Sequence, residues 1–280
     1  MEKYTITQKE RIVELNGNDE MINMEFETVE ERNNSFRQLE KEMVRESKAQ
    51  INSLLNERHM TRTVDVGRQM EKWLISDGFT KVSTPTIITK QMLAKMTIDD
   101  DHHLSEQVFW LDGKKCLRPM LAPNLYVVMR ELKRITNNPV KIFEIGSCFR
   151  KESQGAHHMN EFTMLNFVEL GTVQEGEQLE HLKSMAHKAM LNLGIPKEEY
   201  QLVVEESTVY GSTVDIEING MEVASGSYGP HFLDAKWGVF DTWVGIGFGI
   251  ERLTMAIEKS KTIKRYGRSI AFIDGQPLNI

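Results

Sequence analysis

Apolar residues in the first sixty positions recur at helical spacing among many charged ones. Phe36, Leu39 and Met43 lie three or four residues apart, a spacing typical of an amphipathic helix. A polar Asn-Gly-Asn cluster at 16–18 separates this helix from an earlier one. The stretch has few apolar residues to form a core. We therefore interpret residues 1–60 as a helical N-terminal segment that packs on the main body or reaches toward a partner.

From residue 61 to 280 the pattern changes to helices that alternate with short apolar strands. A helix is predicted over 61–76 and a strand over 79–84, which Pro85 ends. Further strands are predicted at 107–111, 139–149, 161–171, 201–206, 213–218, 221–228 and 243–249, and further helices at 122–135, 174–193 and 249–258. Short polar connections such as Asn219-Gly220 join several strands. The pattern predicts one α+β domain with a mainly antiparallel β-sheet flanked by helices.

Composition narrows the class of protein only modestly. Apolar residues make up 40% of the 280 positions and charged residues 27%, as in ordinary globular proteins. No run of eighteen apolar residues or secretory signal is present, and two distant cysteines suggest reduced thiols, so we expect a cytoplasmic protein without a membrane span. The net charge of −7 argues mildly against a nucleic-acid coat. The basic run at 259–268 could contact RNA or form a solvated turn.

The predicted strand at 161–171 carries an unusual row of side chains. Residues two apart face the same side of a strand, so Phe162, Met164, Asn166 and Val168 share one face. A buried carboxamide without partners costs about 1–3 kcal/mol, so we expect Asn166 to face a polar group. The alternative is a core asparagine that other protein groups satisfy.

An arginine follows the preceding strand. If 139–149 and 161–171 form a hairpin, Arg150, Glu152 and His158 surround the point where Phe162 emerges. The planar guanidinium of arginine suits an α-phosphate, and the phenylalanine ring suits a purine. Taken singly, these residues also fit a solvated turn.

A glycine-rich strand precedes the second arginine of interest. Gly245, Gly247 and Gly249 alternate with apolar residues after Trp243, and Glu251-Arg252 then begins a helix. Glycines on one face leave room for a ligand against the backbone, although a structural explanation also fits. The spacing is not a dinucleotide fingerprint. Upstream, Glu222 and Ser225 offer the oxygen ligands that Mg²⁺ prefers.

A stripe on the predicted helix at 122–135 completes the candidate site. Ala122, Leu125, Tyr126 and Met129 lie on one face. Such a stripe is usually core. Here it directly follows Arg118-Pro119-Met120-Leu121, so it could instead wall an apolar pocket.

Four stretches together resemble the pyrrolysyl-tRNA synthetase family of class II aminoacyl-tRNA synthetases. They are 117–126, 143–153, 161–167 and 247–252. The segment that ends at Pro85 is similar to class II motif 1, the hairpin with Arg150 to motif 2, and the Gly-Arg segment to motif 3. The resemblance implies an antiparallel core, a homodimer joined through motif 1, and the short form of the enzyme without a separate N-terminal tRNA-binding domain.

The resemblance also implies a role for each residue. Arg150 and Arg252 would be the catalytic cations. ATP would be bound by Arg150, Glu152, His158, Phe162, Glu222, Ser225 and Arg252, with Mg²⁺ on Glu222 and Ser225. Pyrrolysine would be bound by Ala122, Leu125, Tyr126, Met129, Asn166, Val168, Tyr210, Trp243 and Gly245, with Asn166 on the side-chain amide and Tyr210 as a cap. Tyr228 departs from the small aliphatic residue expected there, which puts the pocket shape in question.

The implied reaction is ATP-dependent activation of pyrrolysine, or another bulky Nε-acylated lysine, and its transfer to tRNA(Pyl). One alternative is a class II synthetase for phenylalanine or phosphoserine. A phosphoserine site would need cations in the 122–129 stripe, and a phenylalanine site would not need Asn166. Another alternative is a synthetase-like protein that binds tRNA or an amino acid without catalysis, against which the pair Arg150 and Arg252 argues.

Overall fold

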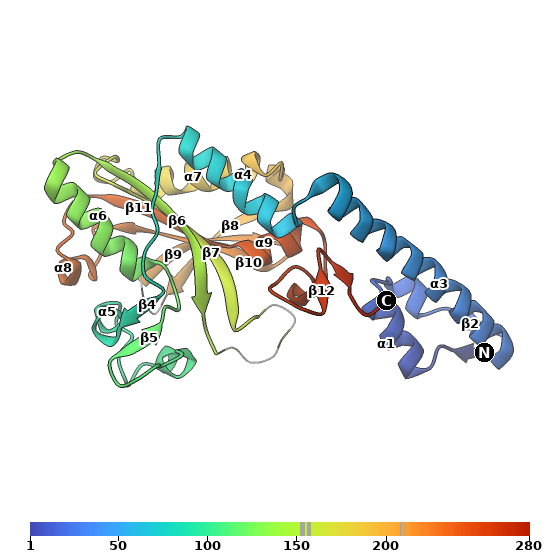
Figure 1. Ribbon diagram of the computed structural model, residues 1–280. Coiled ribbons are helices and arrows are strands. Elements are labelled where there is room, and N and C mark those ends of the chain that lie inside the picture. The colour runs from blue at the N-terminus through green and yellow to red at the C-terminus, as the bar shows by residue number, and fades with distance from the viewer. Residues whose placement is uncertain (152–154, 156–157, 208, 210) are drawn as a thin grey trace. The chain divides into compact units, whose positions relative to one another are not determined.

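The chain divides into two compact units. The computed structural model describes residues 1–151, 155, 158–207, 209 and 211–280 (Figure 1). Unit 1 consists of Met1–Val64 with Lys264–Ile280, and unit 2 of Asp65–Ile263.

Unit 1 is a small helical module with its own apolar core. Its elements are β1 (Glu2–Lys3), α1 (Ile6–Glu14), α2 (Asp19–Ile22), β2 (Glu25–Phe26), α3 (Val29–Ser53), η1 (Leu54–Arg58), β12 (Phe272–Ile273) and β13 (Gln276–Pro277). Thr5, Asn18 and Thr28 cap the three helices by accepting backbone N–H groups. Tyr4, Ile12, Leu15, Phe26 and Met43 form the buried cluster.

The C-terminal residues 264–280 group with this unit, whereas the sequence analysis placed them in the catalytic domain. The reason is a buried guanidinium. Arg265 donates to the carbonyl of Gly275 at 2.7 Å and to the carbonyl of Glu14, at the end of α1, at 3.0 Å. Arg58 also pairs with Asp274 at 2.7 Å. Arg265, one cation of the basic run at 259–268, therefore binds residues from both ends of the chain.

Unit 2 is built on a seven-stranded sheet in the order β3-β6-β7-β11-β10-β9-β8. The strands are β3 (Thr80–Lys81), β6 (Val140–Phe149), β7 (Glu161–Leu170), β8 (Gln201–Ser207), β9 (Gly211–Ile218), β10 (Met221–Gly229) and β11 (Trp243–Gly249). Every pairing is antiparallel except that of β3 with β6. The predicted α+β fold is confirmed, with one parallel edge strand added.

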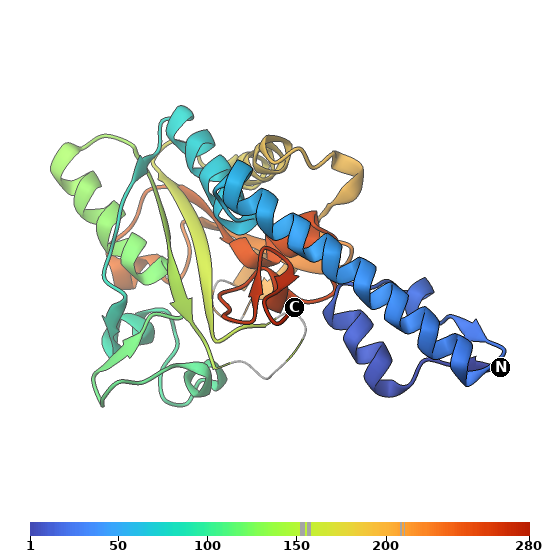
Figure 2. The ribbon, with the colours of Figure 1, turned by 45° about the vertical axis from the view of Figure 1, so that its right-hand side comes forward.

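Helices cover both faces of this sheet (Figures 1 and 2). The helices are α4 (Arg62–Ser76), α5 (Lys90–Lys95), α6 (Ala122–Thr136), α7 (Gln178–Asn192), α8 (Asp234–Trp237) and α9 (Ile250–Ile257), with short turns η2 (His103–Gln107), η3 (Lys197–Glu199) and η4 (Ile263–Arg265). Residues of α4, α7 and α9 form one core cluster, and residues of α5, α6 and α8 form the other. In the described chain, no helix combines the length and the hydropathy that a bilayer span requires.

Two predicted strands differ from the structure. Most of the region at 107–111 follows the turn η2, with Trp110 in an isolated bridge to Cys116. The strand predicted at 79–84 is shortened to β3, and the chain then forms the small hairpin of β4 (Ile87–Thr89) and β5 (Lys115–Leu117). Short apolar runs of this length fit several local structures, and tertiary contacts decide between them.

Both cysteine side chains are fully buried in the cluster that contains α6. Burial raises the pKa of Cys116 to about 11 and that of Cys148 to about 12. The reactive thiolate is therefore scarce in the folded protein at pH 8. We expect iodoacetamide to alkylate the native protein at least about 100-fold more slowly than the guanidinium-unfolded protein. Mass spectrometry of timed samples measures both rates, and rapid native labelling of either thiol would contradict this expectation.

Candidate active site

A cavity of about 230 Å³ lies over the middle strands of the sheet and against α6. Most residues that the sequence analysis proposed for the site line it. They are Ala122, Leu125, Tyr126, Met129, Arg150, His158, Phe162, Asn166, Val168, Glu222, Ser225, Trp243, Gly245 and Arg252. The two other candidates, Glu152 and Tyr210, lie outside the described residues.

The floor of the cavity is a patch of backbone where three strands meet. Asn166 on β7 pairs with Gly247 on β11, and Gly247 pairs with Ser225 on β10. A Cβ atom at residue 247 would lie 2.8 Å from the Asn166 side-chain nitrogen. At residue 245 it would lie 3.0 Å from the carbonyl oxygen of Phe167. Glycine at these positions therefore keeps space open over the strands.

The Asn166 carboxamide presents an unsatisfied atom to this space. Its Oδ1 is buried and has no hydrogen-bond partner among the residues that the structure describes. Ser227 also lines the cavity, and its Oγ is likewise buried without a hydrogen-bond partner among the described residues. A buried acceptor without a donor costs about 1–3 kcal/mol, and a bound ligand is one way to supply the missing partner.

The two arginines reach the same cavity from different elements. Arg150 follows β6, and its Nε donates to the carbonyl of Pro119 at 3.0 Å, while its guanidinium carbon lies 5.3 Å from the centre of the Phe162 ring. Arg252 is in the first turn of α9 and donates from Nη1 to the carbonyl of Glu222 at 3.2 Å. The structure thus brings together two cations that are about one hundred residues apart in sequence.

The carboxylate of Glu222 lies in the field of both arginines. Partial burial raises its pKa, and Arg252 and, more weakly, Arg150 oppose that shift. The distance from Glu222 Oε2 to Arg252 Nη1 is 4.0 Å. The carboxylate therefore lies near Arg252 and within the electrostatic influence of Arg150.

Ser225 is held by a residue that the sequence analysis missed. Its hydroxyl donates to Asp215 Oδ1 on β9 at 2.5 Å, across the registered pair Ser225–Asp215. Among the described residues, no cluster of three or more His, Cys, Asp or Glu side chains suits a metal. Mg²⁺ commonly binds through one or two carboxylates plus phosphate and water, so this oxygen set fits it.

The apolar wall is fixed by a buried carboxylate. Asp234 is 2% exposed. It accepts the Tyr126 hydroxyl at 2.9 Å and the Trp243 indole N–H at 2.8 Å. Tyr126 also stacks on Trp237, with ring centroids 5.2 Å apart. Asp234 lies 108 residues from Tyr126 in sequence, so no local pattern could have indicated it.

Tyr228 does not shape the cavity, contrary to the sequence analysis. It pairs with Val244 and packs on the opposite core cluster, whereas its neighbour Ser227 lines the cavity. A register shift between Glu222 and Ala224 marks a bulge in β10, which changes the residues that face each side.

Glu251 is a further residue that the sequence analysis left without a role. It is 2% exposed, lines the cavity, and accepts the Thr163 N–H with both carboxylate oxygens, at 2.9 and 2.8 Å. It therefore ties the start of α9, next to Arg252, to the beginning of β7. Its position directly before Arg252 was the available signal.

Comparison with known proteins gives a consistent family. Residues 46–274 match the family described as tRNA synthetases class II core domain (F). Among curated proteins, the chain is similar to the O-phosphoserine–tRNA(Cys) ligase of Methanocorpusculum labreanum, with 23% identity over 199 residues. That alignment covers 64% of this chain but only 36% of the relative, so the chain spans little more than a third of its length.

Solved structures give a closer likeness over the whole chain. A crystal structure of pyrrolysyl-tRNA synthetase from Desulfitobacterium hafniense is 49% identical, with a TM-score of 0.91 and coverage of 99% of both chains. A second structure of a pyrrolysyl-tRNA synthetase from that organism is 47% identical, with a TM-score of 0.88 and coverage of 99% of this chain and 96% of the other. The chain therefore belongs to the class II aminoacyl-tRNA synthetases and, within that class, to the pyrrolysyl-tRNA synthetase family.

Proposed function

We propose that this chain activates pyrrolysine, or another bulky Nε-acylated lysine, with ATP and transfers it to the 3′ end of tRNA(Pyl). The observation that carries the proposal is an unsatisfied carboxamide, Asn166, within a cavity that has apolar walls. The solved relatives named pyrrolysyl-tRNA synthetases support the choice of amino acid.

The substrate's side chain complements this cavity. A secondary amide has one carbonyl acceptor and one N–H donor, and a carboxamide pairs with both. Leu125, Met129 and Val168 offer apolar contact to the rest of the side chain. Ala122, Tyr126, Trp243 and Gly245 complete the binding set, with Tyr210 as a proposed cap.

The nucleotide is assigned to the arginine side of the site. Arg150 would bind the α-phosphate and Arg252 a distal phosphate. Both arginines line the cavity, and the positive charge of each acts to lower the pKa of Glu222. Phe162 would stack on adenine, with the guanidinium of Arg150 already over its ring. Glu152 and His158 would contact the adenine and phosphates.

Glu222 and Ser225 would hold Mg²⁺. Asp215 accepts the hydrogen bond that the Ser225 hydroxyl donates, which leaves the lone pairs of Oγ available to a cation. When bound, the metal supplies positive charge to the phosphates.

The chemistry needs no nucleophile from the protein. The substrate carboxylate attacks the α-phosphorus of ATP, a new P–O bond forms, and pyrophosphate leaves to give the aminoacyl-adenylate. A ribose hydroxyl of the tRNA then attacks the carbonyl carbon and AMP leaves. The contribution of the chain is to align the reactants and to place Arg150 and Arg252 where negative charge develops.

Phosphoserine is the strongest rival substrate, since a curated relative is an O-phosphoserine–tRNA(Cys) ligase. The four α6 side chains on the cavity wall argue against it, because they are Ala122, Leu125, Tyr126 and Met129. A phosphate there would need cations or hydroxyl clusters. Phenylalanine is the other rival, and it would leave the carboxamide of Asn166 unpaired.

ATP–pyrophosphate exchange with the purified chain tests the proposal. We expect exchange with pyrrolysine or Nε-acylated lysine, and at least about 100-fold slower exchange with phenylalanine or phosphoserine, because apolar contacts alone cannot replace the amide pairing. Exchange with phenylalanine or phosphoserine alone would identify a rival synthetase. No exchange with any amino acid would favour a binding protein without catalysis.

Three further assignments belong to this proposal. We propose a homodimer joined through the segment that ends at Pro85, a cytoplasmic location, and contact between residues 1–60 and tRNA. Light scattering, fractionation and crosslinking to tRNA(Pyl) test them separately, and none bears on the identity of the amino acid.

A further inference from the structure

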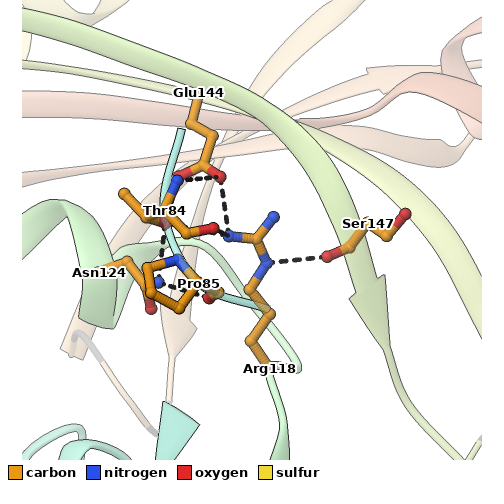
Figure 3. A network of polar contacts seen from close by, with 6 residues as sticks. All are labelled: Thr84, Pro85, Arg118, Asn124, Glu144 and Ser147. Atoms are coloured by element: carbon orange, nitrogen blue, oxygen red, sulfur yellow. Dashed lines mark hydrogen bonds and ion pairs between the residues drawn. The ribbon is translucent and has the colours of Figure 1, made fainter. Parts of the chain in front are cut away.

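A buried polar network joins the segment after β3 to β6 and the start of α6, and it contains none of the proposed substrate-binding residues (Figure 3). Its centre is an ion pair between Arg118 Nη1 and Glu144 Oε1 at 2.8 Å. The two side chains are only 3% and 2% exposed. A buried ion pair is rarely more stabilising than well-packed apolar residues of similar volume, so stability alone does not account for it.

The network fixes the segment between β3 and β4 against β6. The Glu144 carboxylate accepts the backbone N–H of Thr84 at 3.1 Å and its hydroxyl at 2.6 Å. From the first turn of α6, Asn124 donates to Thr84 Oγ1 at 2.7 Å and to the carbonyl of Pro85 at 2.9 Å. Glu144, Thr84 and Asn124 are therefore each held by more than one bond (Figure 3).

The guanidinium of Arg118 lies directly over the β6 backbone. Its Nε donates to the carbonyl of Ser147 at 2.9 Å. A Cβ atom at Gly146 would come within 2.1 Å of Arg118 Nη2, so any side chain there would displace the guanidinium. The strand thus carries a glycine where the arginine needs to lie flat.

The main chain at Arg118 and Pro119 connects this network to Arg150, the proposed catalytic arginine. The carbonyl of Arg118 accepts the backbone N–H of Phe149 at 2.9 Å, and the carbonyl of Pro119 accepts Arg150 Nε at 3.0 Å. Fixing Nε restricts the plane of the planar guanidinium. The Pro119 carbonyl therefore contributes to the orientation of Arg150 in the cavity.

We infer that Arg118, held by Glu144, is a positioning residue for Arg150. The inference rests on the proposed role of Arg150 at the ATP phosphates. Arg118 itself touches no substrate in this scheme. It holds the Pro119 carbonyl in place, and that carbonyl orients the guanidinium group of Arg150. Misplacement by about 1 Å of a group that acts on the transition state costs on the order of 10²-fold in rate.

The test is a double-mutant cycle on the full chain. Arg118→Met combined with Glu144→Leu removes both charges and leaves neither unpaired. We expect kcat for exchange to fall between about tenfold and 100-fold, with the KM for the amino acid within about twofold of wild type. In an Arg150→Lys background, which lacks the Nε–H, the same pair of substitutions should change kcat by less than about threefold.

A matched control separates positioning from loss of stability. Glu169 is also a buried carboxylate of the sheet, bound to Thr172 at 2.8 Å and His181 at 3.1 Å. Glu169→Gln should lower the melting temperature yet leave kcat within about twofold. Arg118→Lys is the second variant if the double variant does not fold. It keeps the charge near Glu144 but cannot reproduce the fork to Ser147 and Thr84, so it should show a smaller loss that also disappears in the Arg150→Lys background.

Affinity for ATP with Mg²⁺, measured by calorimetry, is a second readout that needs no amino acid. We expect the dissociation constant to rise about tenfold in the Arg118→Met/Glu144→Leu variant and to change little in the Arg150→Lys background. A folded variant with unchanged kcat and ATP affinity, or equal losses in both backgrounds, would overturn the inference. Failure of wild type to exchange with any amino acid would count against the proposed function instead, and the ATP comparison would still decide the positioning role.

Discussion

Arg150→Ala should slow ATP–pyrophosphate exchange by about 10³-fold, because it removes a charged donor at the point where charge develops in the transition state. The arginine lines the cavity and lies over the ring of Phe162, so its removal also takes away one wall of the proposed nucleotide site. The exchange rate at saturating amino acid and ATP measures the loss. The melting temperature should change little, since Arg150 follows β6 instead of lying within the core.

The matched control is Arg134→Ala. Arg134 is 70% exposed on α6, pairs with Glu131, and is not among the residues that line the cavity. The same chemical change there should leave exchange within about twofold. A loss of less than tenfold at Arg150 in a folded protein would mean that another group neutralises the phosphate, and the assignment of this arginine would be wrong.

Asn166→Ala should change the preferred amino acid more than it changes the overall rate. Sites built to pair with a polar substrate group reject analogues without it by about 10⁴–10⁵-fold. With the carboxamide gone, the amide of an acylated lysine loses its partner, and an aromatic side chain no longer leaves Oδ1 unpaired. We expect the ratio of kcat/KM between acylated lysine and phenylalanine to fall on the order of 10³-fold.

Competition between the two amino acids in the exchange assay measures that ratio directly. Asn138→Ala, in the exposed loop before β6, is the control and should leave the ratio unchanged. If Asn166→Ala keeps the wild-type ratio while the protein remains folded, the carboxamide has only a structural role. The proposed substrate class would then depend on the comparisons with relatives alone.

Much of the site could be predicted because its signals are local. The alternation on 161–171 correctly indicated that Phe162, Asn166 and Val168 share a face of β7, and they line one cavity. The glycines of β11 indicated a surface left open for a ligand. Long apolar runs also predicted the bounds of β6 and β7 to within one or two residues, because regular burial produces regular periodicity.

The features that escaped prediction depend on distant pairings. Asp234 fixes Tyr126 and Trp243, and Glu144 meets Arg118, through contacts that no short window contains. The parallel pairing of β3 with β6 has the same origin. Tyr228 shows a different limit: one bulge in β10 moved the cavity-facing position to Ser227, and a bulge leaves no reliable mark in a single sequence.

The glycine floor on β11 has a consequence for changing this enzyme by selection. Bare backbone cannot be trimmed, so mutations at Gly245 or Gly247 can only make the chamber shallower. New room can come from α6, where Leu125, Tyr126 and Met129 are large enough to shorten. Mutant libraries confined to α6 would change which amino acids the site accepts, and they would leave β11, the strand before Arg252, unaltered. Recognition and activation can therefore evolve on separate elements of one fold.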